Sequence, residues 1–261
     1  MARAWKIYRA FLRSALVRTM MFKADFFAKL ASVTTWVLFV SFAVVVVYDN
    51  AETIAGWARG PAFVLSGTAF LASSFGYLVF PSLIELPEQI RRGTLDFVLT
   101  KPVDSQFWVS FRMIELSNLG VVIGSMGMIA YGVSTSDYVP RLENWAAYAV
   151  GLAGALALLY SLRLALMTLA VWFVRVDNLW VLEESTEQIA RNPVEIFGPP
   201  VRQFLTHVLP VALLGTIPAR QLVGPVVLPE VVLSVVWAGL GLFLSRRFWR
   251  LAMVSYSSAS S

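Results

Sequence analysis

Cysteine is absent from the 261 residues of the chain, and histidine occurs once, as His207. Disulfide bonds, cysteine nucleophiles, thiolate metal sites and multi-histidine metal cages are therefore excluded. Charged residues are scarce, at 14% against about 25% in an ordinary soluble domain. Hydrophobic residues make up 58% of the chain, and its mean hydropathy is +0.70. This composition excludes a disordered chain and indicates an integral membrane protein rather than a water-soluble enzyme.

A nucleotide-binding loop is missing as well. The Walker A pattern, G-x-x-x-x-G-K-[ST], uses its lysine and backbone amides to hold phosphates, and this sequence contains no Gly-Lys pair. We therefore expect no catalytic residue, no metal ion and no cofactor on this chain.

Long apolar runs are what the sequence has instead. A helix needs roughly 20 apolar residues to cross a bilayer core about 30 Å thick. Six runs predict an all-α fold with six transmembrane helices, at 26–48, 61–84, 111–133, 145–174, 203–219 and 226–245. The fifth run is short and contains Pro210 and Pro218, and the connection 217–229 is rich in proline and glycine. We expect broken or re-entrant structure there.

The distribution of basic residues predicts the orientation. Six spans place both termini on one side, and fifteen Lys and Arg residues fall on that side, in the N-terminal segment, the loops 85–106 and 175–202, and the C-terminal tail. The opposite connections carry three, Arg59, Arg141 and Arg220. The positive-inside rule therefore predicts cytoplasmic termini, and it explains the pI of about 9.7 without nucleic acid.

The two ends of the chain flank the predicted membrane domain, 26–250. Residues 1–25 predict an amphipathic helix at the membrane interface, with cations on one face and apolar residues on another; the alternative is a soluble basic tail. The apolar face is formed by Trp5, Tyr8, Leu12 and Leu16. Residues 251–261, rich in serine, predict a disordered tail.

The loop 85–106 contains residues that typically begin and end helices, and it predicts two short helices. Pro87 suits a first helical turn, Gly93 is placed to end it, and Thr94 can cap a second helix that stops before Pro102. Its apolar residues need either a partner, the membrane surface or packing beneath the spans. They are Ile90, Leu95, Phe97, Val98 and Leu99.

Charges inside the predicted spans are few. Arg163 lies in the fourth span, and Glu115 lies near the start of the third. Arg163 either pairs with Glu115, lines a polar pathway, or contacts headgroups and water. The carboxylates at 183, 184 and 187 lie in the loop 175–202, where we expect a solvated outer face, with a secondary docking contact as the alternative.

Five stretches together carry a family resemblance: 88–96 (EQIRRGTLD), 99–103 (LTKPV), 190–194 (ARNPV), 209–212 (LPVA) and 217–219 (IPA). In order and spacing they resemble the ABC-2 type export permeases, most closely the short six-span subgroup described as ABC-2 family transporter protein.

The resemblance implies a half-channel that pairs with a second permease subunit and with two copies of a separate ABC ATPase, which would hold the ATP and Mg²⁺. It implies that 87–100 is the coupling segment that sits in a cleft of the ATPase. Ile90, Leu95 and Phe97 would then be its buried anchors. Orienting polar contacts would come from Glu88, Arg91, Arg92, Thr94 and Asp96.

The sequence thus predicts the permease subunit of an ATP-driven exporter in a prokaryotic plasma membrane, in contact with lipid. The scarcity of intramembrane charge favours an amphiphilic or hydrophobic substrate. The alternatives are an ion-coupled secondary transporter and a non-transporting membrane anchor for an ATPase.

Overall fold

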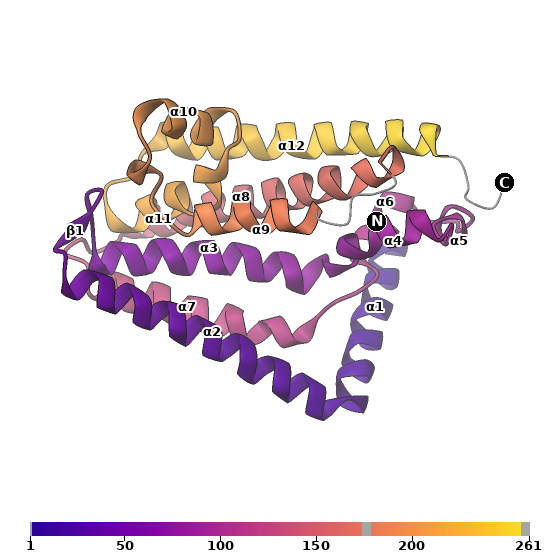
Figure 1. Ribbon diagram of the computed structural model, residues 1–261, viewed down its shortest axis with the longest axis horizontal. Helices are drawn as coiled ribbons and strands as arrows, with labels where there is room; N and C mark the ends of the chain where they lie inside the picture. The colour runs from indigo at the N-terminus through magenta and orange to yellow at the C-terminus, as the bar shows by residue number, and fades with distance from the viewer. Residues whose placement is uncertain (1, 174–178, 257–261) are drawn as a thin grey trace.

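The computed structural model describes residues 2–173 and 179–256, and in them it is an elongated bundle of helices (Figure 1). Five helices in the described residues are long and apolar enough to cross a membrane. They are α2 (Lys23–Asp49), α3 (Arg59–Val79), α7 (Leu119–Ser134), α8 (Leu142–Thr168) and α12 (Leu228–Ser255). The short 3₁₀ helix η2 (Leu116–Asn118) extends α7 at its start, and η3 (Leu169–Val171) extends α8 at its end. The prediction of an all-α membrane protein is confirmed in this form, with five candidate spans rather than six.

The two ends of the bundle differ. At one end, the strands β1 (Thr53–Ile54) and β2 (Trp57–Ala58) form an antiparallel hairpin between α2 and α3; we call this the hairpin end. At the other, which we call the elbow end, four short helices join α3 to α7. They are η1 (Pro81–Glu85), α4 (Leu86–Arg91), α5 (Asp96–Leu99) and α6 (Ser105–Phe111).

Helix α3 lies at the centre of the bundle, because its small residues allow neighbouring helices to approach closely. A Cβ atom added at Gly132 of α7 would lie 2.6 Å from the backbone oxygen of Gly60 and 2.7 Å from the backbone nitrogen of Val64. Glycine is therefore required at this crossing, as at many crossings of membrane helices.

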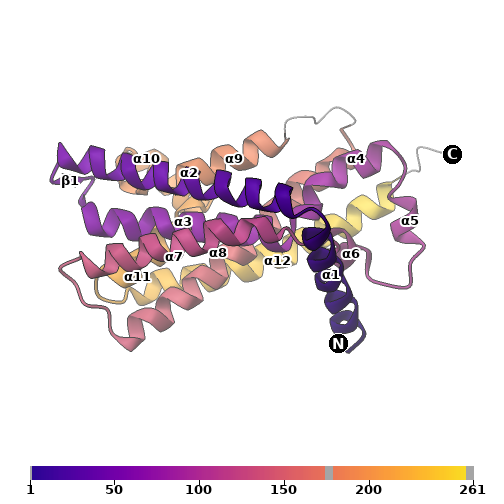
Figure 2. The same cartoon turned by 90° about the horizontal axis from the view of Figure 1, so that it is seen from below.

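The segment 175–202 is not a loop at one end of the bundle, so that prediction is wrong. Within it, α9 (Leu179–Ala190) starts near the elbow end and runs back along α3 towards the hairpin end (Figures 1 and 2). The hydroxyl of Ser66 donates a hydrogen bond to the backbone oxygen of Arg191 at 3.4 Å. Further on, Trp57 Nε1 of the hairpin donates to the Glu195 carboxylate at 3.1 Å. Because α9 has 12 residues and carries three glutamates, neither length nor hydropathy identifies it.

The predicted fifth span at 203–219 is also wrong. Its residues form α10 (Pro199–His207), the turn η5 (Val211–Leu214) and α11 (Thr216–Val223), which lie near the hairpin end. The break falls at Pro210, which begins η5 as its N-cap. The broken structure predicted for 217–229 therefore extends over the whole of 199–227, and α12 then returns to the elbow end.

Three predicted boundaries need correction. Helix α7 begins at Leu119, so Glu115 precedes it rather than lying inside a span. Helix α12 continues to Ser255, so residues 251–255 are helical and do not belong to a disordered tail. The last residue of the predicted fourth span, 174, and residues 257–261 of the predicted tail lie outside the described residues.

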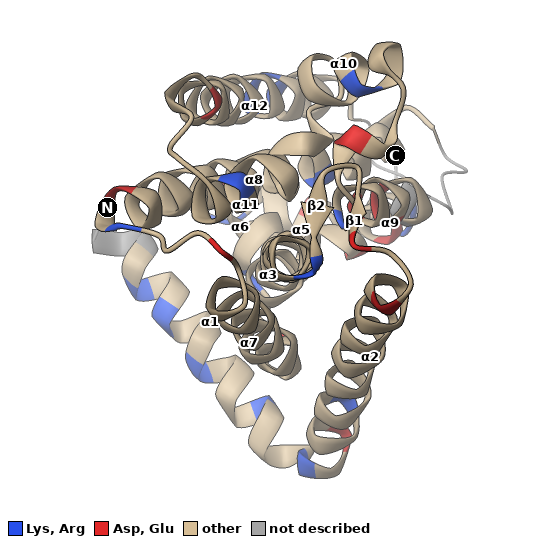
Figure 3. Cartoon of the chain, turned by 90° about the vertical axis from the view of Figure 1, so that its left-hand side faces the viewer, with Lys and Arg blue, Asp and Glu red and all other residues tan. Residues whose placement is uncertain are grey.

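Helix α1 (Ala2–Met21) lies across the elbow end of the bundle rather than along it (Figures 1 and 3). Trp5, Leu12 and Leu16 are exposed, and Tyr8 is half-buried with its ring stacked on that of Trp5. This transverse orientation agrees with an interfacial helix, which stays a prediction.

Candidate functional site

The elbow consists of α4, the turn at Gly93 and α5. The backbone φ of Gly93 is +67°, a conformation that glycine adopts without the steric cost of a Cβ atom. The prediction of two short helices that meet at Gly93 is therefore confirmed. Thr94 does not cap the second helix, because its hydroxyl instead donates to the backbone oxygen of Gln89 at 3.4 Å.

The inner face of the elbow is buried in the bundle. Leu95 is fully buried, and with Leu86 and Val98 it packs in a cluster that includes residues of α8 and α12. The partners from these long helices are Leu164, Met167 and Trp249. Leu95 therefore cannot also be an anchor in a partner protein, and that prediction is wrong. Ile90 packs, half-buried, against the same cluster.

The outer face of the elbow is open to a partner. Phe97 is 72% exposed and Leu99 is 40% exposed, which is high for large apolar side chains outside the long helices. Glu88 forms ion pairs with Arg91 and Arg92, both of which are exposed. Asp96 is half-buried. This face, formed by Arg91, Arg92, Thr94, Phe97 and Leu99, is called the elbow face below.

Polar contacts join the segment after the elbow to α12. Asp104 caps α6 by accepting a hydrogen bond from the backbone amide of Phe107 at 2.9 Å. Nη1 of Arg246 donates to Asp104 at 3.1 Å and to the side chain of Gln106 at 2.7 Å. The hydrogen bond from Arg246, above all, lowers the pKa of the Asp104 carboxyl below its usual value. Helix α12 and the elbow segment are therefore linked by packing and by charge.

A second site lies inside the bundle, around Arg163 of α8. Its side chain is fully buried and forms ion pairs with Glu183 of α9 and, at 3.4 Å, with Glu187 one turn later. The guanidinium also lies 4.4 Å from the ring centre of Tyr77. A buried pair of this kind disfavours separation of its helices, because each charge alone would be stranded in an apolar environment.

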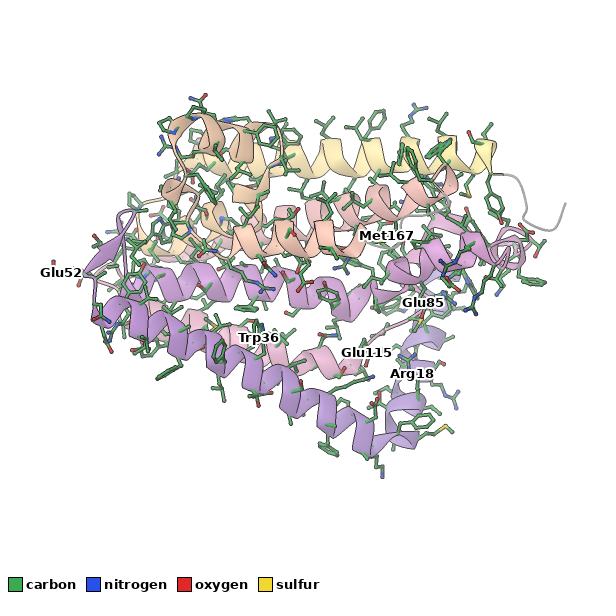
Figure 4. The ribbon with its side chains drawn as sticks, in the orientation of Figure 1. Arg18, Trp36, Glu52, Glu85, Glu115 and Met167 are labelled. Atoms are coloured by element: carbon green, nitrogen blue, oxygen red, sulfur yellow. The ribbon has the colours of Figure 1, made fainter. Side chains whose placement is uncertain are left out.

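The structure corrects both predictions for these charges. Arg163 pairs with α9 and not with Glu115, and since it has no exposed surface it does not line an open pathway. Glu115 instead lies 3.8 Å from Arg18 of α1, whose Nη2 also donates to the backbone oxygen of Ile114 at 2.8 Å (Figure 4). Glu183 and Glu187 are buried, so they do not form a solvated face. Their spacing of four residues, which places both on one side of a helix, is the signal that would have revealed them.

A third polar cluster lies at the hairpin end. Arg220 of α11 forms ion pairs with Glu195 and with Glu230 of α12. The side-chain amide of Asn144 in α8 donates to the backbone oxygens of Gln221 at 2.7 Å and Gly224 at 2.9 Å. This cluster fixes the short helices of 199–227 to the long ones. No sequence motif marked it.

The described residues contain no group of three or more histidine, aspartate or glutamate side chains arranged to hold a metal ion.

Comparison with protein families decides what kind of membrane protein this is. The family model described as ABC-2 family transporter protein matches residues 34–260. The chain belongs to this family. It is a multi-pass membrane protein of the ABC transporter permease type, a component that carries out transport rather than catalysis. No curated protein and no solved structure matches it significantly.

Proposed function

We propose that the chain is the permease subunit of an ATP-driven exporter and that the elbow face docks on a separate ABC ATPase. In the complete assembly, two ATPase subunits and a second permease subunit complete the transporter, in a prokaryotic plasma membrane with the elbow end in the cytoplasm. The observation that carries the proposal is the two-sided elbow, with Phe97 exposed on its outer face and Leu95 buried on its inner face.

The packing of the inner face supports a mechanical role. A rigid-body movement of the ATPase would displace the elbow, whose buried residues belong to the same hydrophobic cluster as Leu164 and Met167 of α8 and Trp249 of α12. Because packed interiors transmit displacement instead of absorbing it, α8 and α12 would move with the elbow. The contact between Arg246 and Asp104 adds a polar connection to α12.

The basic residues support the sidedness. Arg191 and Arg202 lie within the bundle and near the hairpin end, so they no longer belong to the fifteen at the elbow end. Arg175 lies outside the described residues. Twelve of the fifteen remain against five even if Arg191 and Arg202 count on the other side, and the bias towards a cytoplasmic elbow end persists.

Charge reversal on the elbow face tests the proposal. Arg91→Glu with Arg92→Glu is expected to release an ABC ATPase, identified by its Walker A peptide, that co-purifies with the tagged chain from native membranes. Arg250→Glu, an exposed change in α12, is the matched control and is expected to retain it. Equal ATPase recovery from both variants would contradict the proposal, and retention of the ATPase without ATP-dependent transport in vesicles would favour the anchor. Transport driven by an ion gradient without any ATPase would favour the secondary transporter.

A further inference from the structure

The arginine of the 190–194 stretch lies at bilayer depth without a carboxylate partner. The guanidinium of Arg191 lies 4.4 Å from the ring centre of Phe70, which is at the middle of the 21-residue helix α3. Within the described part of the chain, no carboxylate lies within 4.0 Å of Arg191, and its buried Nε has no hydrogen-bond acceptor. Glu187, the carboxylate whose charge acts most strongly on it, already pairs with Arg163. An unpaired cation at this depth is costly, and such residues mark functional sites.

A cavity of about 390 Å³ opens beside this arginine, between α2, α3 and α9. Its walls differ in character. The wall from α2 is mainly apolar and comprises Val40, Ala43, Val44, Val47 and Tyr48. The opposite side combines apolar residues, such as Leu65 and Ile196, with the polar side chains of Ser66, Gln188, Arg191 and Asn192. The volume is in the range of small-molecule sites, in which apolar walls hold the ligand and a few polar groups orient it.

The two walls define the chemistry of the ligand. Arg191 requires an acceptor with negative charge, and the side-chain amide of Gln188 lies in the same wall. The amide of Asn192 already donates to the backbone oxygen of Gln188 at 3.1 Å and keeps one hydrogen for a ligand. A hydrocarbon alone would leave the arginine unsatisfied, and a small inorganic anion would leave the α2 wall uncovered. A molecule with an anionic head and an apolar body satisfies both walls.

We propose that this cavity binds amphiphilic organic anions, with the carboxylate, phosphate or sulfate on Arg191 and the apolar body along α2. The inference deepens the proposed function, on which it rests, by naming the class of compound that the permease carries. It also assigns a role to the 190–194 stretch, which lies away from the elbow face.

The test uses a fluorescent fatty acid, dansylaminoundecanoate, and its methyl ester, which lacks the charge. The full chain with its co-purifying ATPase is placed in phosphatidylcholine nanodiscs, and binding is measured by energy transfer from the protein's tryptophans to the dansyl group. The wild type is expected to bind the carboxylate at least about tenfold more tightly than the ester, since hydrogen bonds to a charged group are the strong ones. Arg191→Gln is expected to remove this preference and leave ester binding unchanged.

Two controls locate the effect. Arg202→Gln removes an exposed arginine of α10 and is expected to keep the preference. Ala43→Trp fills the cavity from the α2 side and is expected to weaken both probes. Arg191→Lys retains the charge, so it is expected to keep part of the preference if Arg191→Gln fails to fold. Three results would overturn the proposal. The preference for the carboxylate over the ester could survive in Arg191→Gln, or it could fall as much in Arg202→Gln as in Arg191→Gln. Alternatively, Ala43→Trp could leave the binding of both probes unchanged.

The source of the ligand is a separate arm of the test. If phosphatidylglycerol in the nanodisc displaces the fatty acid from the wild type, the natural ligand is a membrane lipid with an anionic head group. If it does not, the natural ligand is another anionic amphiphile. Both results support the anionic class. Arg191→Gln is expected to retain the co-purifying ATPase. Failure of this proposal would therefore leave the elbow result intact. Dissociation of a permease oligomer by Arg191→Gln with an unchanged preference would instead make Arg191 an interface residue and overturn the proposal.

Discussion

The buried centre around Arg163 and the charged pairs at the elbow end use the same residue types under opposite conditions. Arg163 has no exposed surface and is held by two carboxylates of α9, whereas the pairs of Glu88 with Arg91 and Arg92 are largely exposed. Exposed pairs contribute about 0–1 kcal/mol, but removing one partner of a buried pair costs about 3–5 kcal/mol. The difference teaches that buried charge fixes the helices inside the bundle, whereas the exposed pairs of the elbow contribute little to its stability and are free to serve the recognition that we propose.

The largest expected effect comes from Arg163→Leu. Removing the guanidinium leaves Glu183 and Glu187 buried without a counter-ion, so we expect a loss of about 3–5 kcal/mol in the free energy of unfolding. Thermal unfolding of the detergent-solubilised protein, followed by tryptophan fluorescence, measures it. The variant Arg163→Leu with Glu183→Leu and Glu187→Gln is expected to recover much of the loss; no recovery would mean that the charges are not coupled.

Leu95→Ala is expected to have the next largest effect, a loss of about 2–5 kcal/mol, because Leu95 is fully buried against α8 and α12. Phe97→Ala, two residues away, is expected to leave the unfolding temperature nearly unchanged and to weaken ATPase recovery instead. The opposite pattern, with a stable Leu95→Ala that loses the ATPase, would reverse our assignment of the two faces.

A smaller effect is expected at the hairpin end. Arg220→Gln removes the partner of two half-buried carboxylates, and the cost of leaving such groups unsatisfied is about 1–3 kcal/mol. The same unfolding assay measures it, with Arg141→Gln as a control on an exposed arginine at that end. A loss of unfolding free energy in Arg220→Gln that does not exceed the loss in Arg141→Gln would show that the cluster does not fix the short helices.

The smallest effect is expected from Asp104→Asn, and it depends on pH. Because Arg246 lowers the pKa of Asp104, the stabilisation is present above the unfolded value of 3.8 and is lost as the pH falls through the lower folded value. The unfolding temperature of the wild type should therefore exceed that of the variant at pH 7, and the gap should close as the pH falls below 3.8. A gap that widens at low pH would contradict the assigned pairing.

The sequence identifies the elements whose signals are local. Gly93 and Pro87 placed the elbow, and long apolar runs with few charged residues placed the cores of α2, α3, α7, α8 and α12. The periodicity of the apolar residues at 1–25 predicted the helix α1, whose place at a membrane interface stays a prediction.

The burial of one side of α9, the two faces of the elbow and the polar cluster at the hairpin end could not be predicted, because each depends on contacts between residues distant in the chain. Helix α9 has neither the length nor the hydropathy of a span. The side of it that carries Glu183 is nevertheless buried, because Arg163, 20 residues away from Glu183, forms an ion pair with this glutamate. Leu95 and Phe97 are equally apolar, and only the packed structure shows that one faces the bundle and the other a partner. The contacts that Arg220 makes with Glu195, 25 residues away, were likewise invisible.

The central claim is that the elbow face contacts an ATPase, and photo-crosslinking tests it most directly. A benzophenone amino acid is placed at Phe97 and, as the control, at Val139, which is 82% exposed and lies in the loop between α7 and α8 at the hairpin end. We predict a crosslink to an ABC ATPase from position 97 and none from position 139. The absence of any ATPase crosslink from position 97, both with and without ATP, would contradict the account.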